Sequence, residues 1–376
     1  MRKKLAAFLC CLPLLFMTAY AAEEESDFDY ASHYQASGAD ELYGELPDET
    51  VDDLAQIGFE KGHSSPVTNL DVDALLRSVM KMTASEMRTP LSYAGMLLGV
   101  LLLASLFKSG EDTLSSSLSS GAETAVSAAA SVTLVFPVLS LIEQISDCVN
   151  TAGTFTQAFA PVFAGILIAN GQTASAAGGG AFLLGAVELS SVCVEGLILP
   201  MLRIFLALSC VSSLSEDVQI DAIIGFFEKN AKWILSFLGV LLSASLSISG
   251  VLAASADNVA ARAAKFVIAG SVPVVGGAVS DAYLSIKSGM ALLRNSVGAF
   301  GIVAVAYLFL PVIIRTALWR FVAEMGLSVS ETLGLGSLKK LMRSLAGMLS
   351  LMLGVTVFSL FLLTLGSIIV ILQKTA

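Results

Sequence analysis

The chain has 376 residues and is too apolar and too weakly charged for a soluble protein. Hydrophobic residues make up 55% of it and charged residues only 14%, whereas soluble domains carry about 25% charged residues. The composition therefore predicts an all-α, polytopic membrane helix bundle and excludes an ordinary soluble globular domain. The formal net charge of −10 does not suit binding to nucleic acid.

The first residues have the form of a secretory signal peptide, residues 1–21. Three basic residues precede a short apolar run that reaches Met17, and Ala19-Tyr20-Ala21 has the A-x-A form that signal peptidase recognises. The run is shorter than the roughly 20 residues of a spanning helix, so we expect cleavage after Ala21 rather than an uncleaved first span. The mature N-terminus would then lie outside the cytoplasm.

Residues 22–90 form an acidic segment that we expect to be extracytoplasmic. From residue 23 to 90 there are 16 acidic and four basic residues, a net charge of −12, whereas residues 91–376 hold 15 acidic and 14 basic residues. Up to about Gly44 the segment is weakly patterned, and we expect disorder there. Apolar residues at helical spacing then predict short amphipathic helices over 46–57 and 69–90. The segment is either a solvated linker or a surface on which partners dock.

Hydrophobic runs make residues 91–376 a polytopic membrane domain. The predicted spans and long apolar runs are 91–107, 121–142, 181–214, 233–255, 297–319 and 345–372. Two further apolar segments are interrupted by Pro and Gly, which weaken a helix at membrane depth: Pro161 with Gly165, and Pro273 with Gly277. These broken segments either cross the membrane, which gives eight spans, or are re-entrant, which gives six. The distribution of Lys and Arg favours re-entrance.

Landmark residues indicate an internal duplication. Prolines and arginines recur at a spacing of 111 or 112 residues: Pro161 with Pro273, Pro200 with Pro311, and Arg203 with Arg315. The repeat units would be residues 121–232 and 233–343, followed by a final span over 345–372. Chance similarity between apolar segments is the alternative explanation.

Four ionisable residues inside apolar segments are the candidate functional groups: Glu123, Glu188, Glu195 and Arg203. Glu188 and Glu195 are seven residues apart and share one helix face. Arg203 follows Pro200, where we expect a kink because the apolar run exceeds one bilayer crossing. These groups either line a polar path or ion-coupling site, or form an internal Glu–Arg pair that fastens two helices.

The sequence contains no motif for catalysis, for cofactor binding or for metal binding. The two histidines, His33 and His63, lie in the acidic segment, which excludes His-based catalysis and His-ligated metals from the membrane part. A phosphate-binding loop motif is absent from the sequence. Cys148, Cys193 and Cys210 lack C-x-x-C spacing and are interpreted as small buried apolar residues. We therefore expect a protein that is not an enzyme.

The order of these features resembles the stage III sporulation protein AE family of endospore-forming bacteria. The matching features are the signal peptide, the acidic segment ending at Met87-Arg88-Thr89-Pro90, the two Pro/Gly-broken segments, and the basic stretch before the final span. The resemblance implies a multi-pass protein of the mother-cell membrane facing the forespore. It also implies a subunit of a channel or export-like complex that works with a cytoplasmic ATPase and intermembrane ring proteins and sustains late gene expression in the forespore. It supplies no catalytic residue.

Two other functions agree with the sequence. An autonomous ion-coupled secondary transporter would use the duplicated broken segments together with Glu188 and Glu195. A membrane scaffold without a conduction path would use neither. In each case the chain contacts membrane lipid, and the sequence leaves homo-oligomerisation open.

Overall fold

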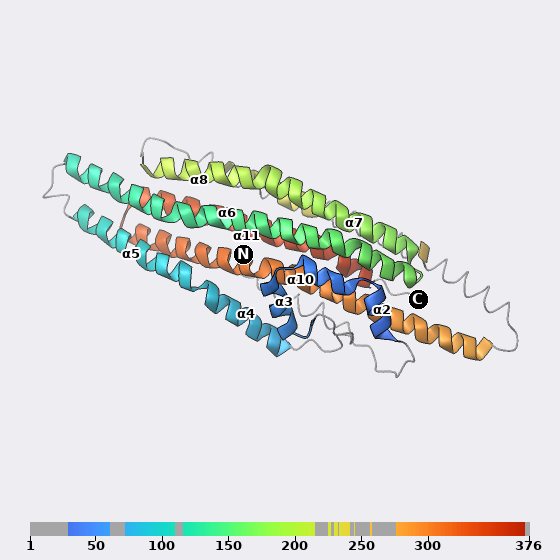
Figure 1. Cartoon of the computed structure of the whole chain (residues 1–376). Coiled ribbons are helices and arrows are strands. Elements are labelled where there is room, and N and C mark those ends of the chain that lie inside the picture. Colours follow the sequence, from blue (N-terminus) through green and yellow to red (C-terminus); the bar gives the residue numbers. More distant parts are fainter. Residues whose placement is uncertain are drawn as a thin grey trace.

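The computed structural model describes residues 29–60, 72–109, 116–214 and 276–372, together with short helical pieces between 225 and 257 (Figure 1). Over these residues every regular element is a helix, which confirms the all-α prediction. Four short helices come first: α2 (Tyr30–Ala36), η1 (Ala39–Glu45), α3 (Asp48–Gln56) and α4 (Val72–Glu86). The remainder are α5 (Arg88–Ser109), α6 (Ser116–Ala169), α7 (Thr173–Ser191), the π-helix η2 (Val192–Ile198), α8 (Leu199–Leu214), α10 (Gly276–Thr332) and α11 (Gly336–Leu372).

The long helices lie side by side in one elongated bundle (Figure 1). Five stretches of the described residues are long and apolar enough to cross a membrane: Asp73–Lys108, Ala125–Ala169, Thr173–Val211, Ile286–Thr332 and Gly336–Leu365. These stretches confirm that the chain is built as a polytopic helix bundle.

Chain direction alternates between the two ends of the bundle. At the end on the left of Figure 1, α5 ends, α6 begins, α8 ends and α10 turns into α11. We call this the inner end. At the opposite, outer end, α6 turns into α7 and α10 begins. The helices α5, α8 and α10 thus run toward the inner end, and α6 and α11 run toward the outer end.

Two helices are much longer than a bilayer is thick. α6 has 54 residues and α10 has 57, so at 1.5 Å per residue they extend over about 80 Å and 85 Å. The hydrocarbon core of a bilayer is about 30 Å thick. The bundle therefore extends well beyond one bilayer thickness along its axis.

The predicted interruption at Pro161 is absent. The segments 121–142 and 154–169, expected to be separate, are parts of the single helix α6, which passes through Pro161 and Gly165. The ring of Pro161 is on the exposed side of the helix, where the missing backbone hydrogen bond disturbs no packed neighbour. Pro311 is likewise inside α10. The two segments of α6 thus run in one direction and do not cross separately.

Most of the second broken segment and much of the first half of the second repeat unit, including residues 258–275, lie outside the described residues. Pro273 is not described, and Gly277 is in the first turn of α10. The internal duplication therefore stays a prediction.

The expected deformation near Pro200 takes the form of a π-helix. A continuous helical rod leads from α7 through η2 into α8, and Pro200 is the second residue of α8. Proline cannot donate to the carbonyl four residues before it, and the wider π-turn ahead of it accommodates this loss. The chain therefore continues in the same direction from α7 through the π-helix into α8.

The N-terminal helices pack on the side of the bundle. The ring of Tyr43 is 4.7 Å from that of Phe300 in α10, and the ring of Phe59 is 5.9 Å from it. We call residues 29–60 the acidic lobe. The expected disorder up to Gly44 is wrong for residues 29–44, because buried aromatic and aliphatic side chains fix them to the bundle: Tyr30, Tyr34, Ala39, Leu42 and Tyr43. The predicted amphipathic helix over 46–57 is present as α3.

Stacked aromatic rings join α6 to α10 beside the acidic lobe. Phe155, Phe159 and Phe163 follow one face of α6 with ring centroids 5.1 to 6.0 Å apart, and all three are buried. Phe159 lies directly over Gly301 of α10, where a Cβ atom would overlap its ring. This close contact sets the separation of the two longest helices.

Candidate functional site: a polar belt at mid-length of the bundle

Arg315 forms the centre of a polar cluster between three helices. Its Nε and Nη2 atoms donate to the two carboxylate oxygens of Glu86, at 2.5 and 2.7 Å, and its Nη1 donates to the side-chain oxygen of Gln144. The Glu86 side chain is 17% exposed and that of Arg315 is 33% exposed. A bidentate, partly buried pair of this kind is both stronger and more directional than a surface ion pair.

Gln144 is fixed from both sides. Its Nε2 donates to Ser140 Oγ at 3.0 Å, one turn earlier on α6, which leaves its oxygen free to accept from Arg315. The end of α4, the middle of α6 and the last third of α10 are thereby linked at one level of the bundle.

Glu195 is held at the same level by two hydroxyl groups. Ser146 of α6 donates to Oε1 at 3.2 Å, and Ser191 donates to Oε2 at 3.3 Å. Glu195 lies inside the π-helix η2, and π-turns occur often at functional positions. We call Glu86, Gln144, Ser146, Glu195 and Arg315 the polar belt.

The other predicted candidates do not join this cluster. Glu188 and Arg203 are exposed on the surface of α7 and α8. Among the described residues, no ion pair links Arg203 to Glu188 or Glu195, so the internal Glu–Arg pair considered from the sequence is not formed there. Glu123 lies in α6, but its side chain is outside the described set.

The sequence does not predict the ion pair between Arg315 and Glu86. It offers Arg315 as a repeat landmark and as a candidate polar-lining or helix-break position, and it places Glu86 in the acidic segment. The pair joins residues 229 positions apart, and hydrophobic periodicity carries no information on such a contact. The available signal was an acidic residue directly before the first span together with an arginine at the end of an apolar run.

One face of α6 changes character at the polar belt. On the inner side its exposed residues are apolar or small: Ala125, Ala129, Val132 and Phe136. On the outer side the same face continues with Glu143, Asp147, Asn150, Thr154 and Gln157. Spacings of three and four residues keep these positions on one stripe of the helix. We call the second group the polar stripe.

Polar contacts also close the two ends of the bundle. At the outer end, both carboxylate oxygens of Asp257 accept from the first backbone N–H groups of α7, Ala174 and Ser175, at 2.9 Å each, which caps that helix. Arg294 Nη1 donates to Gln172 in the same turn at 3.3 Å. These buried contacts fasten the turn between α6 and α7 to α10 and to the short helical piece that contains Asp257.

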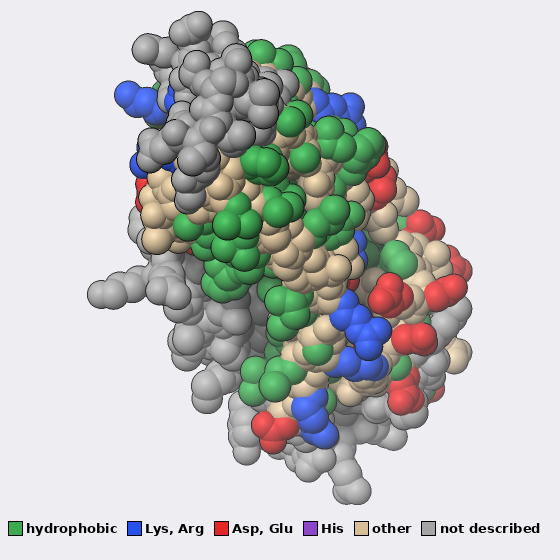
Figure 2. All heavy atoms as spheres, turned by 90° about the vertical axis from the view of Figure 1, so that its left-hand side faces the viewer, with side chains coloured by type: hydrophobic (Ala, Val, Ile, Leu, Met, Phe, Trp, Pro, Cys, Tyr) green, Lys and Arg blue, Asp and Glu red, His purple; other side chains and the backbone are tan. Residues whose placement is uncertain are grey.

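The inner end is basic. Lys108 donates to the backbone oxygen of Gly334, and Glu331 pairs with Lys339 at 3.0 Å and with Arg343 at 3.1 Å. Figure 2, which looks at this end, shows broad apolar areas between basic groups, with acidic side chains gathered along one side. Basic residues gather at the cytoplasmic ends of membrane helices.

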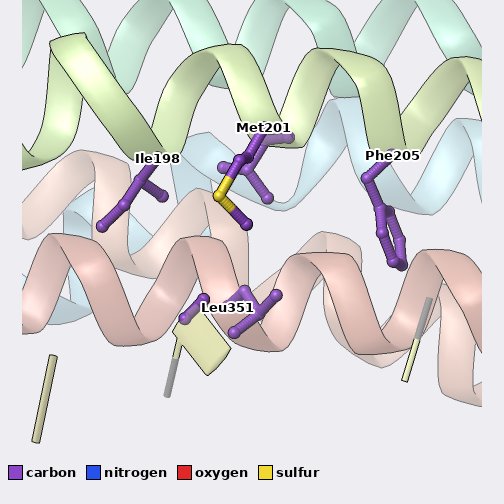
Figure 3. A pocket seen from close by; sticks show the side chains of 6 residues that line it. Ile198, Met201, Phe205 and Leu351 are labelled. Atoms are coloured by element: carbon purple, nitrogen blue, oxygen red, sulfur yellow. The ribbon is translucent and has the colours of Figure 1, made fainter. Parts of the chain in front are cut away.

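A pocket between α8 and α11 is apolar. The side chains that line it are Ile198, Met201, Leu202, Phe205, Ala231 and Leu351 (Figure 3). Within the described part of the chain, no group of three or more His, Cys, Asp or Glu residues could hold a metal ion. Cys148 and Cys193 are buried free thiols and Cys210 is half-buried, as expected for small apolar residues.

Comparison with known proteins places this bundle in a family. Residues 59–375 match the family model of stage III sporulation protein AE. Stage III sporulation protein AE of Bacillus subtilis (strain 168) is 24% identical over 248 residues, which cover 64% of this chain and 62% of the relative. The chain thus spans less than two thirds of that relative, and no solved structure matches it. Because the family model covers most of the sequence, the chain belongs to the stage III sporulation protein AE family.

Proposed function

We propose that this chain is a membrane-embedded subunit of a channel or export-like complex that connects mother cell and forespore and is needed for late gene expression in the forespore. Family membership supports a role in sporulation. The observation that carries the proposal is the acidic lobe, folded firmly onto the bundle and far from the basic inner end. A chain with an acidic lobe on its outer half and a basic inner end suits contacts on both sides of a membrane.

The acidic lobe is the proposed docking surface for the intermembrane partners. Its apolar side chains are buried against the bundle, whereas seven carboxylates are exposed: Asp29, Glu41, Glu45, Asp48, Glu49, Asp52 and Glu60. A rigid acidic surface steers basic partners and fixes their orientation. The basic inner end, with Lys339 and Lys340, is the corresponding surface for a cytoplasmic ATPase.

Charge neutralisation tests this arrangement better than deletion, because deleting the lobe would expose Phe300. The triple variant Glu41→Gln, Glu45→Gln and Asp52→Asn leaves the packed side chains and the first turn of α3 intact. We expect it to remain folded in the membrane and to lose co-purification with the intermembrane ring proteins. Lys339→Gln with Lys340→Gln is the matched control, expected to keep the ring proteins and to weaken binding of the ATPase.

A transport assay distinguishes the proposed function from the secondary-transporter alternative. On the proposed function, the purified chain in liposomes moves no solute under an ion gradient in the absence of its partners. Transport by the isolated chain that is abolished by Glu188→Gln would favour the transporter. Unchanged co-purification of the triple lobe variant with the ring proteins would contradict the proposed docking role of the acidic lobe.

A further inference from the structure

We infer that the bilayer covers only the inner half of the bundle, from the polar belt to the inner end, and that the outer half stands outside it with the acidic lobe. The lipid-contacting surface is then defined by residues of α5, the inner part of α6 and α8. This placement concerns the chain alone and does not depend on the proposed complex.

The position of the acidic lobe gives the first argument. Tyr43 and Phe59 of the lobe contact Phe300, which is 15 residues, or about 22 Å, to the outer side of Arg315 on α10. The lobe carries seven exposed carboxylates, and a carboxylate at hydrocarbon depth is strongly unfavourable. The bundle surface around Phe300 is therefore in water on the side of the lobe.

The exposed face of α6 gives the second argument. Val132 and Phe136, on the inner side of the belt, are 60% and 70% exposed, which suits contact with acyl chains. The polar stripe from Glu143 to Gln157 continues the same face on the outer side. A helix that lay in lipid along its whole length would not present two carboxylates and three other polar side chains in a row.

The length of α5 agrees with a bilayer boundary at the level of the polar belt. α5 begins at Arg88, two residues after Glu86, and its 22 residues extend over about 33 Å, close to the thickness of a bilayer core. From Gly95 to Phe107 its exposed residues are apolar or glycine, with large side chains at Met96, Leu102, Leu103, Leu106 and Phe107. Ile204 and Val211 of α8 and Phe321 of α10 add exposed apolar groups in the same half.

Few ionisable side chains of the described residues fall between the belt and the basic inner end. Arg320 and Glu324 neutralise each other as an i, i+4 pair at 2.7 Å. Arg203 is eight residues, about 12 Å, from Glu195, and a long arginine side chain can extend along the helix toward a polar interface. On the other side of the belt, the outer part of α6, from Glu143 to Ala169, extends over about 40 Å.

Cysteine labelling of the full chain in lipid nanodiscs tests the placement, because both membrane faces are open to reagent there. Val132→Cys, Thr154→Cys and Gln157→Cys replace exposed residues of one α6 face, and Glu49→Cys on the lobe is the aqueous reference. Labelling of the unsubstituted chain is subtracted. Each variant is treated with a small maleimide and with a bulky polyethylene-glycol maleimide that cannot enter a narrow path.

The expected result is that positions 154 and 157 react with both reagents as fast as position 49, while position 132 reacts with neither. Protection of positions 154 and 157 equal to that of position 132 would place the outer half in lipid and overturn the inference. Reaction of positions 154 and 157 with the small reagent alone would also overturn it, because the stripe would then line a narrow path. Reaction of position 132 with the bulky reagent would show that the inner half is not covered by lipid.

Discussion

Arg315 and Glu86 are joined by two hydrogen bonds, Nε to Oε2 at 2.5 Å and Nη2 to Oε1 at 2.7 Å, across 229 residues of sequence. Removing one partner leaves the other partly buried without its ionic partner. We expect Glu86→Gln and Arg315→Gln each to lower the free energy of unfolding by about 1–3 kcal/mol, measured by thermal unfolding in detergent.

A surface ion pair at the inner end provides the control. Arg343 and Glu331 are an exposed pair at 3.1 Å, so Arg343→Gln should lower the free energy of unfolding much less than Arg315→Gln does. Exchanging the charges in the double variant Glu86→Arg and Arg315→Glu should recover part of the lost stability. Equal effects of Arg315→Gln and Arg343→Gln would mean that the bidentate pair contributes no more than a surface contact.

Gly301 permits the close approach of α10 to α6. A Cβ atom at this position would overlap the ring of Phe159, which is itself buried between other aromatic rings and cannot move away freely. Gly301→Ala should therefore destabilise the bundle by about 1–3 kcal/mol, in the same thermal unfolding experiment.

Gly165 is the matched control for this substitution. It lies in α6 with open space around its Cβ position, so Gly165→Ala should be neutral or should stabilise by about 0.5–1 kcal/mol, through the higher helix propensity of alanine. A loss of stability for Gly165→Ala would show that glycine is required there, as the predicted broken segment assumed.

Tyr43 anchors the acidic lobe to α10. Its ring is buried and lies 4.7 Å from that of Phe300, so Tyr43→Ala removes both an aromatic contact and the apolar area that it covers. We expect faster proteolysis within residues 29–60 and unchanged helix content in the bundle. Glu49→Ala, an exposed change on the same lobe, should leave the rate of proteolysis as it is.

Ionisation of Tyr43 should lower the stability of the acidic lobe at high pH. Burial raises the pKa of Tyr43 to about 12, and it also raises the pKa of Tyr34 above its usual value. The unfolded phenol ionises near pH 10, so between pH 10 and 12 the folded state holds the proton that the unfolded state has lost. Lobe stability should stay constant up to about pH 10 and fall above it.

Proteolysis of the lobe across this pH range, followed together with phenolate absorbance, measures the effect. Tyr43→Phe keeps the packed ring and removes the titrating group, so it should shift the onset of proteolysis to higher pH. A variant that loses the lobe at the same pH as the parent chain would assign the transition to other groups.

The parts of the fold that the sequence predicts correctly are those with strong local signals. The run 91–107 appears as α5, Arg88–Ser109, because an uninterrupted apolar stretch satisfies its backbone hydrogen bonds only as a helix. The amphipathic spacing over 46–57 gives α3. Both follow from residues within one or two helical turns of each other.

The course of α6 could have been predicted but was not. The predicted span ends at residue 142, whereas Glu143, Asp147 and Asn150 recur at helical spacing and face outward on the continuing helix. Pro161 was given too much weight, because a proline on an exposed face costs one hydrogen bond and does not end a helix that is packed on its other sides.

The polar belt and the folded lobe depend on contacts between distant segments. Glu86 with Arg315, Ser146 with Glu195 and Tyr43 with Phe300 are each set by how the helices pack, and none leaves a periodic signal in the sequence. The π-helix was foreseen only as a bend near Pro200, since the backbone has several ways to absorb a missing donor.

A cryo-electron microscopy map of the full chain in a lipid nanodisc tests the central claim most directly. The account predicts that the density of the disc surrounds α5 and ends at the level of Arg88 and Glu143, with Phe300 and the acidic lobe clear of it. Disc density that encloses Phe300 and the polar stripe would contradict it.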